Sequence, residues 1–217
     1  MHLKILVTAG PTREALDPVR FLSNRSSGKM GYAIAKAAVR DGHQVCLISG
    51  PVALETPEGV ECIRITTAAE MFATVTAKFN WCEAVIMAAA VADWRPKKYA
   101  PGKLKKSGRA MTLELERTVD ILKSLGQDKG HRLLIGFAAE TTDMLQEARR
   151  KLIEKNLDMI VANDVSRTDA GFGVDHNAVT FVTKDAVEEL PLMSKNATAE
   201  KIINRLEQIG AERGFSR

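Results

Sequence analysis

Short aliphatic runs and amphipathic stretches alternate along most of the chain. Lys4–Ala9 and Gln44–Ser49 have the length and composition of buried strands. Between them, the apolar residues of Gly28–Arg40 recur at helical spacing and predict an amphipathic helix. A strand, a helix and a strand in this order form a βαβ unit, with parallel strands and a right-handed crossover.

The alternation continues through the middle of the chain. Thr67–Glu70 is a capping box and predicts a helix that runs to about Lys78. The apolar run Glu83–Val91 is typical of a central strand that is covered on both faces. Further expected elements are a strand at Glu61–Ile65, a half-exposed strand at Met111–Glu116, a short helix after Thr118, a strand at Arg132–Ala138, a helix at Thr142–Lys155 and a strand at Leu157–Ala162.

The last part of the chain differs in kind. Ala178–Thr183 and Ala186–Leu190 predict an antiparallel hairpin, and Ala197–Ile209 predicts a closing amphipathic helix. The pattern therefore indicates a single α/β domain over residues 1–217. We expect a Rossmann-like, mostly parallel sheet with helices on both faces, an antiparallel hairpin addition near the C-terminus, and ligands at the carboxyl ends of the strands.

Composition narrows the class of protein. Hydrophobic residues make up 45% and charged residues 27%, as in ordinary globular proteins. The longest apolar run, Ala84–Ala92, is far shorter than the ~20 residues of a membrane span, and the start of the chain lacks the apolar region of a signal peptide. Three cysteines without a CxxC pair indicate reduced, buried thiols. We therefore expect a cytoplasmic protein with no membrane partner.

The distribution of charge along the chain is more informative about binding partners than the net charge of +4. Residues 93–109 hold seven basic side chains and one acid, a net charge of +6, in a segment that contains Pro and Gly. Basicity confined to one loop favours a local anion clamp over a nucleic-acid track, so no nucleic-acid partner is expected.

The first turn after Lys4–Ala9 lacks both common phosphate loops. It has no G-x-G-x-x-G spacing, and Met30 stands where a P-loop needs Ser or Thr. Ser23–Gly31 instead brings hydroxyls and small residues to a helix N-terminus, which favours anions. With Arg13, Arg20 and Arg25 nearby, we predict an anion site here; the alternative is an ordinary serine cap.

Other chemistry-bearing residues are few. Asp93 ends the most buried strand and could bind a ribose hydroxyl, a base amino group or a metal, or could cap a turn. Lys103–Lys106 follow Pro101-Gly102 in a loop after a strand end, a pattern that is typical of a lid that closes on phosphates. Lys151 and Lys155 share one helix face, where they could hold an anion or lie in solvent. The histidines have no metal-ligand spacing, and no metal site is expected.

Several motifs carry a resemblance to a known family. They are Thr8–Glu14, Leu16–Arg20, Ser23–Gly31, Ala88–Asp93, Lys103–Lys106, Gly136–Thr141 and Ala162–Val165. Together, and in this order, they resemble phosphopantothenate–cysteine ligase of bacterial coenzyme A biosynthesis. In many bacteria this ligase follows a flavin-dependent decarboxylase. The chain begins at the first ligase strand, so the resemblance implies the free-standing form without flavin.

The resemblance implies a reaction and its partners. The family joins 4′-phosphopantothenate to L-cysteine with CTP and Mg²⁺, through an acyl-cytidylate, and releases CMP and pyrophosphate. It implies a homodimer, small-molecule substrates, and Mg²⁺ bound mainly through the CTP phosphates.

The resemblance also implies roles for particular residues. Lys103 would be the catalytic flap lysine, Asn24 would face the acyl group as a catalytic residue beside substrate-binding Ala90, and Asp93 would read cytidine. The implied nucleotide-binding residues are Gly10, Ser26, Gly28, Gly31, Met87, Ala88, Ala89, Asp93, Lys103, Thr118, Val119, Asp120, Ile121, Phe137, Lys151, Lys155 and Asn163. The family's Lys-Asn-Pro-Asp-Ile loop is Arg117–Ile121 here, so Thr118 and Val119 keep only a backbone role in this comparison.

Two other function classes fit parts of the pattern. An NAD(P)-binding oxidoreductase suits the βαβ start, and Tyr32 and Lys36 have the Tyr-x-x-x-Lys spacing. The missing glycine fingerprint argues against it, and we interpret the pair as chance helical spacing. The third class is a non-catalytic nucleotide-binding regulator.

Overall fold

The computed structural model describes residues 1–105, 110–140, 143–164 and 174–215. Its centre is an eight-stranded sheet in the order β13-β12-β10-β9-β6-β1-β4-β5. The strands are β1 Lys4–Ala9, β4 Gln44–Ser49, β5 Glu61–Arg64, β6 Ala84–Met87, β9 Leu133–Glu140, β10 Met159–Asp164, β12 Val179–Val182 and β13 Val187–Glu189. Neighbours from β5 to β10 are parallel, and β12 and β13 are antiparallel additions. The expected fold class is confirmed.

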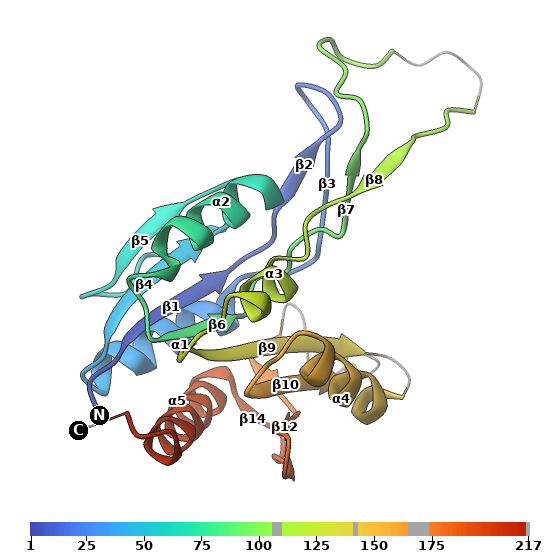
Figure 1. Cartoon of the computed structure of the whole chain (residues 1–217). Helices are drawn as coiled ribbons and strands as arrows, with labels where there is room; N and C mark the ends of the chain where they lie inside the picture. The colour runs from blue at the N-terminus through green and yellow to red at the C-terminus, as the bar shows by residue number, and fades with distance from the viewer. Residues whose placement is uncertain (106–109, 141–142, 165–173, 216–217) are drawn as a thin grey trace.

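Helices cover both faces of the sheet (Figure 1). They are α1 Lys29–Arg40, α2 Ala68–Phe79, α3 Ile121–Gln127, α4 Met144–Glu154 and α5 Lys195–Glu212. Alternate residues of β1 divide the core, because successive side chains of a strand point to opposite faces. Ile5 and Val7 pack with α1 and α5, whereas Leu6 packs with α2, α3 and α4. Both faces of the central strands are therefore buried.

The strand order creates a switch point beside β1. The chain passes from β1 through α1 to β4 on one side, and later through α2 to β6 on the other. The loops after β1 and β6 therefore leave the sheet as neighbours at its carboxyl edge. Open α/β sheets bind ligands at such a point.

Two hairpins form an arm, of which the sequence pattern predicted only the strand expected at Met111–Glu116. Their strands are β2 Arg13–Ala15 with β3 Phe21–Ser23, and β7 Trp94–Pro96 with β8 Leu115–Arg117. Both project together from the carboxyl edge of the sheet (Figure 1). A further short pair, β11 His176–Asn177 and β14 Met193–Ser194, lies before α5.

One carboxylate ties the arm together. Asp17 is 2% exposed, and its oxygens accept hydrogen bonds from Arg20 Nε and Nη2 and from the Leu104 backbone N–H. The Arg20 guanidinium and these N–H donors hold the pKa of Asp17 well below its usual range. Asp17 thereby fixes the chain beside Lys103 to the β2–β3 hairpin.

Three expected elements differ from the observed ones. The strand predicted over Glu83–Val91 ends at Met87, where the chain turns away from the sheet. The strand expected at Met111–Glu116 begins only at Leu115. The closing helix begins earlier than expected, at Lys195, because Ser194 caps it by accepting from Ala197 N–H at 3.2 Å.

The three thiols are free, as expected. Cys46 and Cys82 are buried and Cys62 is half-buried. Burial raises the pKa of Cys46 to about 11 and that of Cys82 to about 12. Neither buried thiol is therefore a ready nucleophile at neutral pH.

Candidate active site

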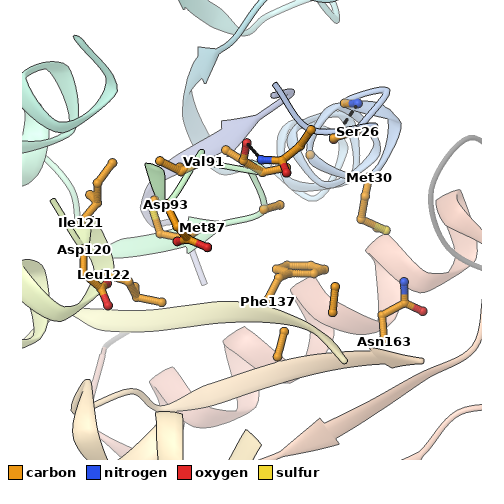
Figure 2. Close-up of a pocket in the computed structure, with 18 of the residues that line it drawn as sticks. Ser26, Met30, Met87, Val91, Asp93, Asp120, Ile121, Leu122, Phe137 and Asn163 are labelled. Carbon is orange, nitrogen blue, oxygen red and sulfur yellow. Dashed lines mark hydrogen bonds between the residues drawn. The ribbon is translucent and has the colours of Figure 1, made fainter. Parts of the chain in front are cut away.

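A cavity of about 770 Å³ opens at the carboxyl edge of the sheet, at the switch point. In Figure 2, Asp120, Ile121 and Leu122 lie on the α3 side, and Ser26 and Met30 lie at the start of α1. Phe137 of β9 lies between them, and Asn163 of β10 lies below Met30 in this view. The volume is within the usual range of small-molecule sites.

Most of the residues assigned by resemblance line this cavity. They are Asn24, Ser26, Gly28, Gly31, Met87, Ala88, Ala89, Ala90, Asp93, Thr118, Val119, Asp120, Ile121, Phe137, Lys151, Lys155 and Asn163. Two assigned residues lie elsewhere. Gly10 packs behind the wall, where a Cβ would approach Val52 Cγ1 to 3.0 Å. Lys103 is exposed on the arm and does not line the cavity.

The start of α1 presents backbone N–H groups to the cavity. Gly28 caps the helix at φ 78°, its N–H donates to Ser26 Oγ at 3.3 Å, and the first turn contains no acidic residue. Gly31 allows the close approach of α1 to β1, because a Cβ there would lie 2.5 Å from Ala9 Cβ and 2.8 Å from Thr8 O. Such a helix start favours an anion.

The arginines expected at this anion site are not part of it. Arg13 lies over the Phe21 ring at 4.6 Å, and Arg20 is bound to Asp17. Arg25 is exposed, and none of the three lines the cavity. Proximity in sequence was misleading because the β2–β3 hairpin carries the first two away from the sheet.

Hydrogen bonds join the segments around the cavity. Asn24 Nδ2 donates to the Ala90 carbonyl at 3.0 Å. Thr118 Oγ1 donates to the Ala92 carbonyl at 2.6 Å, and Thr118 N–H donates to the Asp93 carbonyl at 3.0 Å. The Thr118 side chain thus holds the strand-end loop, which leaves the exposed Asp93 positioned at the cavity rim.

On the opposite wall, the aspartate that caps helix α3 also forms an ion pair with a lysine. Asp120 Oδ1 accepts from Lys123 N–H at 3.0 Å and caps α3, while Asp120 Oδ2 lies 2.8 Å from Lys155 Nζ. Lys151 also lines this wall. The two lysines expected on one helix face therefore do face the cavity, with Lys155 oriented by Asp120.

Other residues also line the cavity, among them Lys29, Trp94, Arg117, Asn177 and Lys195. Lys29 and Arg117 lie in segments that the sequence had indicated, whereas Trp94, Asn177 and Lys195 were missed. The Arg117 guanidinium lies 5.4 Å from the Trp94 ring centroid. The sequence does not indicate that Lys195, the first residue of α5, lines a cavity, because its burial depends on which other segments pack against it.

In the part of the chain that the structure describes, two amide oxygens of the wall have no hydrogen-bond partner. They are Asn163 Oδ1 and Asn177 Oδ1, both buried. Burying a polar atom without a partner is costly, so such atoms indicate a place where a ligand or water completes the bonding. Together the walls offer an aromatic ring, two amides, several lysines and a helix start, which suits a base joined to a polyanion.

Within the described residues, no three His, Cys, Asp or Glu side chains gather as a metal site would require. No described helix is both long and apolar enough to cross a membrane.

Comparisons with known proteins agree with this architecture. The family model of the "DNA/pantothenate metabolism flavoprotein C-terminal domain" matches residues 1–209. The Coenzyme A biosynthesis bifunctional protein CoaBC of Bacillus subtilis (strain 168) is 51% identical over 212 residues, covering 97% of this chain and 52% of that protein.

Solved structures extend the comparison. The crystal structure of the C-terminal domain of a CoaBC protein is 47% identical, covers 96% of each chain and has a TM-score of 0.83. A Cab2 variant in complex with phosphopantothenate-cysteine is 18% identical, with a TM-score of 0.78 over 97% of this chain and 87% of that one. This last similarity shows the fold alone.

The chain spans about half the length of the curated relatives it matches, which are named as bifunctional proteins. The expected free-standing form finds no support among them and stays a prediction. The family model covers nearly the whole chain, and the chain belongs to the DNA/pantothenate metabolism flavoprotein C-terminal domain family.

Proposed function

We propose that the protein is a CTP-dependent ligase that joins 4′-phosphopantothenate to L-cysteine. The products are 4′-phosphopantothenoylcysteine, CMP and pyrophosphate, and an acyl-cytidylate is the intermediate. In this proposal residues 1–217 act as one nucleotide-binding ligase domain, and residues 93–110 include its flap. Family membership and the likeness to a CoaBC C-terminal domain support the reaction class.

The single observation that carries the proposal is the composition of the cavity. One hollow contains the α1 start, Asn24 with Ala90, Asp93, Phe137 and the lysine pair of α4. A nucleotide needs an aromatic or apolar surface for its base and cations for its phosphates. Asn24 lines the same cavity, so a substrate carboxylate that binds beside Asn24 lies in the same hollow as the nucleotide.

The first step sets like charges together, because a carboxylate must approach a triphosphate. Lys151, Lys155 and the N–H groups of α1 reduce that repulsion and stabilise the charge that develops at the α-phosphate. The carboxylate oxygen attacks the α-phosphorus, the bond to the bridging oxygen breaks, and pyrophosphate leaves with the electron pair. The cysteine amine then attacks the acyl carbon, the bond from that carbon to the phosphate oxygen breaks, and CMP leaves with the electron pair while the nitrogen loses a proton to water; this step depends mainly on orientation.

Magnesium fits this site as an ion that enters with the triphosphate. The described residues provide no protein cluster for a metal, while Mg²⁺ commonly binds through substrate phosphates with few carboxylates. Bound in this way, it would supply positive charge to the phosphates. Two of the described carboxylates line the cavity, namely Asp120, which Lys155 binds, and Asp93 at the rim; we assign Asp93 to the cytidine base rather than to the metal.

The arm supports two further parts of the proposal. Lys103 lies in the flap, which Asp17 holds against the β2–β3 hairpin, and we propose that flap closure brings Lys103 over the triphosphate. The arm also exposes large apolar side chains, namely Val19, Phe21, Trp94, Tyr99, Met111 and Leu115. Apolar exposure of this kind favours an interface, and we propose that a second copy of the chain covers it in a homodimer.

The structure does not support the feature that favoured an oxidoreductase, the Tyr-x-x-x-Lys spacing of Tyr32 and Lys36. Tyr32 is buried, its hydroxyl donates to Ser49 Oγ at 3.0 Å and accepts from Arg64 Nη1 at 2.7 Å. Neither Tyr32 nor Lys36 lines the cavity. Tyr32 therefore ties α1 to β4 and β5 through these hydrogen bonds, and Lys36 is exposed on the same helix.

Mass spectrometry of reaction mixtures tests the proposed function. With phosphopantothenate, cysteine, CTP and Mg²⁺, we expect 4′-phosphopantothenoylcysteine and CMP in equal amounts. Without cysteine, we expect the acyl-cytidylate. CTP binding with neither product would instead favour the non-catalytic regulator.

A further inference from the structure

Lys195 stands apart from the other basic residues of the cavity because it is buried. Only 7% of the residue is exposed, and it is the first residue of helix α5. In the sequence it lies far from Lys151 and Lys155. Its Nζ donates to the Val174 carbonyl, and its backbone N–H donates to the Asp175 carbonyl at 2.9 Å. Burying an ammonium is costly unless charge and hydrogen bonds compensate it. Burial lowers the pKa of Lys195, and the positive charge of Lys29 lowers it further.

Lys29 approaches the same corner from α1. It is the first residue of that helix, and its Nζ lies 2.6 Å from Asp175 Oδ1. Lys29 and Lys195 line the cavity described above, and both also line a second hollow of about 840 Å³ between α1, the loop after Leu54 and the start of α5. The two lysines therefore form the wall where the two spaces meet.

Asn177 provides an independent sign of a ligand-binding site at this corner. It is 4% exposed and lines the cavity, yet among the described residues its Oδ1 has no hydrogen-bond partner, and its Nδ2 donates to Met30 Sδ at 3.4 Å. A rotation of the amide by half a turn would present its N–H groups to the cavity and would give up that weak contact. An anion with several oxygens could then accept from Asn177, the lysines and the start of α1.

We propose that Lys29, Lys195 and Asn177, with the α1 start, form a subsite for the pyrophosphate group, and that Asp175 is an internal anion competing for it. This deepens the proposed function, on which it rests. While the triphosphate is intact, the subsite holds its β- and γ-phosphates. When the carboxylate attacks the α-phosphorus, the same cations receive the negative charge of the leaving pyrophosphate.

Asp175 gives the subsite a way to release its product. Its carboxylate already binds Lys29, and its carbonyl anchors the first N–H of α5, so it stays beside both lysines. Pyrophosphate must displace this carboxylate to bind Lys29, and the carboxylate returns as pyrophosphate leaves. The side-chain carboxylate and the backbone carbonyl of Asp175 thus affect the affinity of the subsite for pyrophosphate, not the rate of the chemical step.

Calorimetric titration with inorganic pyrophosphate tests the subsite without turnover. Lys195→Met keeps the apolar stem and removes the charge, and we expect the dissociation constant to rise about 10-fold to 100-fold, as for loss of a charge-assisted hydrogen bond. Asp175→Asn should lower it several-fold. Lys36→Met is the matched control, because exposed Lys36 lines only the second hollow and should leave the constant unchanged.

The outcomes separate this subsite from the proposed ligase activity. Thermal melts of each variant check that the fold is intact, and Lys29→Met provides a second variant if Lys195→Met does not fold. Wild-type affinity in both lysine variants, or no pyrophosphate binding by the wild type, would overturn the subsite even if the protein makes phosphopantothenoylcysteine. Weakened pyrophosphate binding with no ligase products would keep the subsite and reject the ligase.

Discussion

The side-chain amide of Asn24 donates to the backbone carbonyl of Ala90 at 3.0 Å. One residue follows β1 and the other follows β6, so this bond spans the switch point of the sheet. It holds the loop before α1 against the loop that leads to Asp93. The two residues that the resemblance assigns to the acyl substrate are thus in direct contact.

Asn24→Ala should lower turnover about 10²-fold, because a small misplacement of reacting groups carries a cost of that size. Asn24 is exposed, so the free energy of unfolding should change little. Steady-state kinetics and a thermal melt measure the two effects. A large loss of stability with unchanged turnover of the folded protein would make Asn24 a structural residue only.

Lys103→Gln should lower the turnover number about 10²–10³-fold, as removal of one stabilising donor does in other enzymes. The residue is exposed on the arm, so the melting temperature should stay near that of the wild type. Lys105→Gln is the control, since it removes an equal charge two residues away. Equal losses in both variants would reduce the flap to general electrostatic attraction.

Gly31→Ala should destabilise the protein by about 1–3 kcal/mol, because the added methyl must displace α1 from β1. The same displacement moves the N–H groups at the helix start, so CTP affinity should fall as well. Gly102→Ala is the matched control, since a Cβ at Gly102 has no neighbouring atom within 4 Å. Urea unfolding and calorimetry give the two quantities. A Gly31→Ala protein as stable as Gly102→Ala would refute the close packing.

Asp17 predicts a pH dependence of stability. Its pKa in the folded protein lies below the ordinary value of 3.8, so its ionised form stabilises the fold at neutral pH. That contribution is lost as the pH falls through 3.8 toward the lower folded value. We therefore expect Asp17→Asn to be less stable than the wild type at pH 7, with the difference shrinking below pH 4.

Urea unfolding at a series of pH values measures this difference. Asp41→Asn is the control, because Asp41 forms an exposed pair with Arg40 and such pairs contribute little. A difference between wild type and Asp17→Asn that stays constant from pH 7 to pH 3 would contradict the assignment.

Local patterns predicted the central elements but, in the arm, only the strand expected at Met111–Glu116, which overlaps β8. Lys4–Ala9 and Gly28–Arg40 carry strong periodicity, and both formed within a residue of their expected bounds. The hairpins of the arm have strands of three residues with many polar side chains, so pairing with distant segments defines them. Ala88–Val91 looked like strand because small apolar residues suit both a sheet and the wall of a cavity.

The candidate site divides in the same way. Ser26 lies just before α1 and Asp93 lies in the connection that follows β6, at the edge of the sheet where topology concentrates ligand sites, so a sequence can indicate them. Lys195 and Asn177 were missed because burial and an unpartnered amide arise only when α5 packs beside α1. The arginine cluster was wrong for the converse reason, since Arg13 and Arg20 found partners within the arm.

Pyrophosphate release tests the central claim most directly. The intact protein is mixed with Mg²⁺ and either CTP or ATP, with and without phosphopantothenate. We predict release that requires phosphopantothenate and is much faster with CTP, because a pocket that hydrogen-bonds one base leaves polar groups unpaired with another. Binding of CTP without phosphopantothenate-dependent release of pyrophosphate would contradict the account.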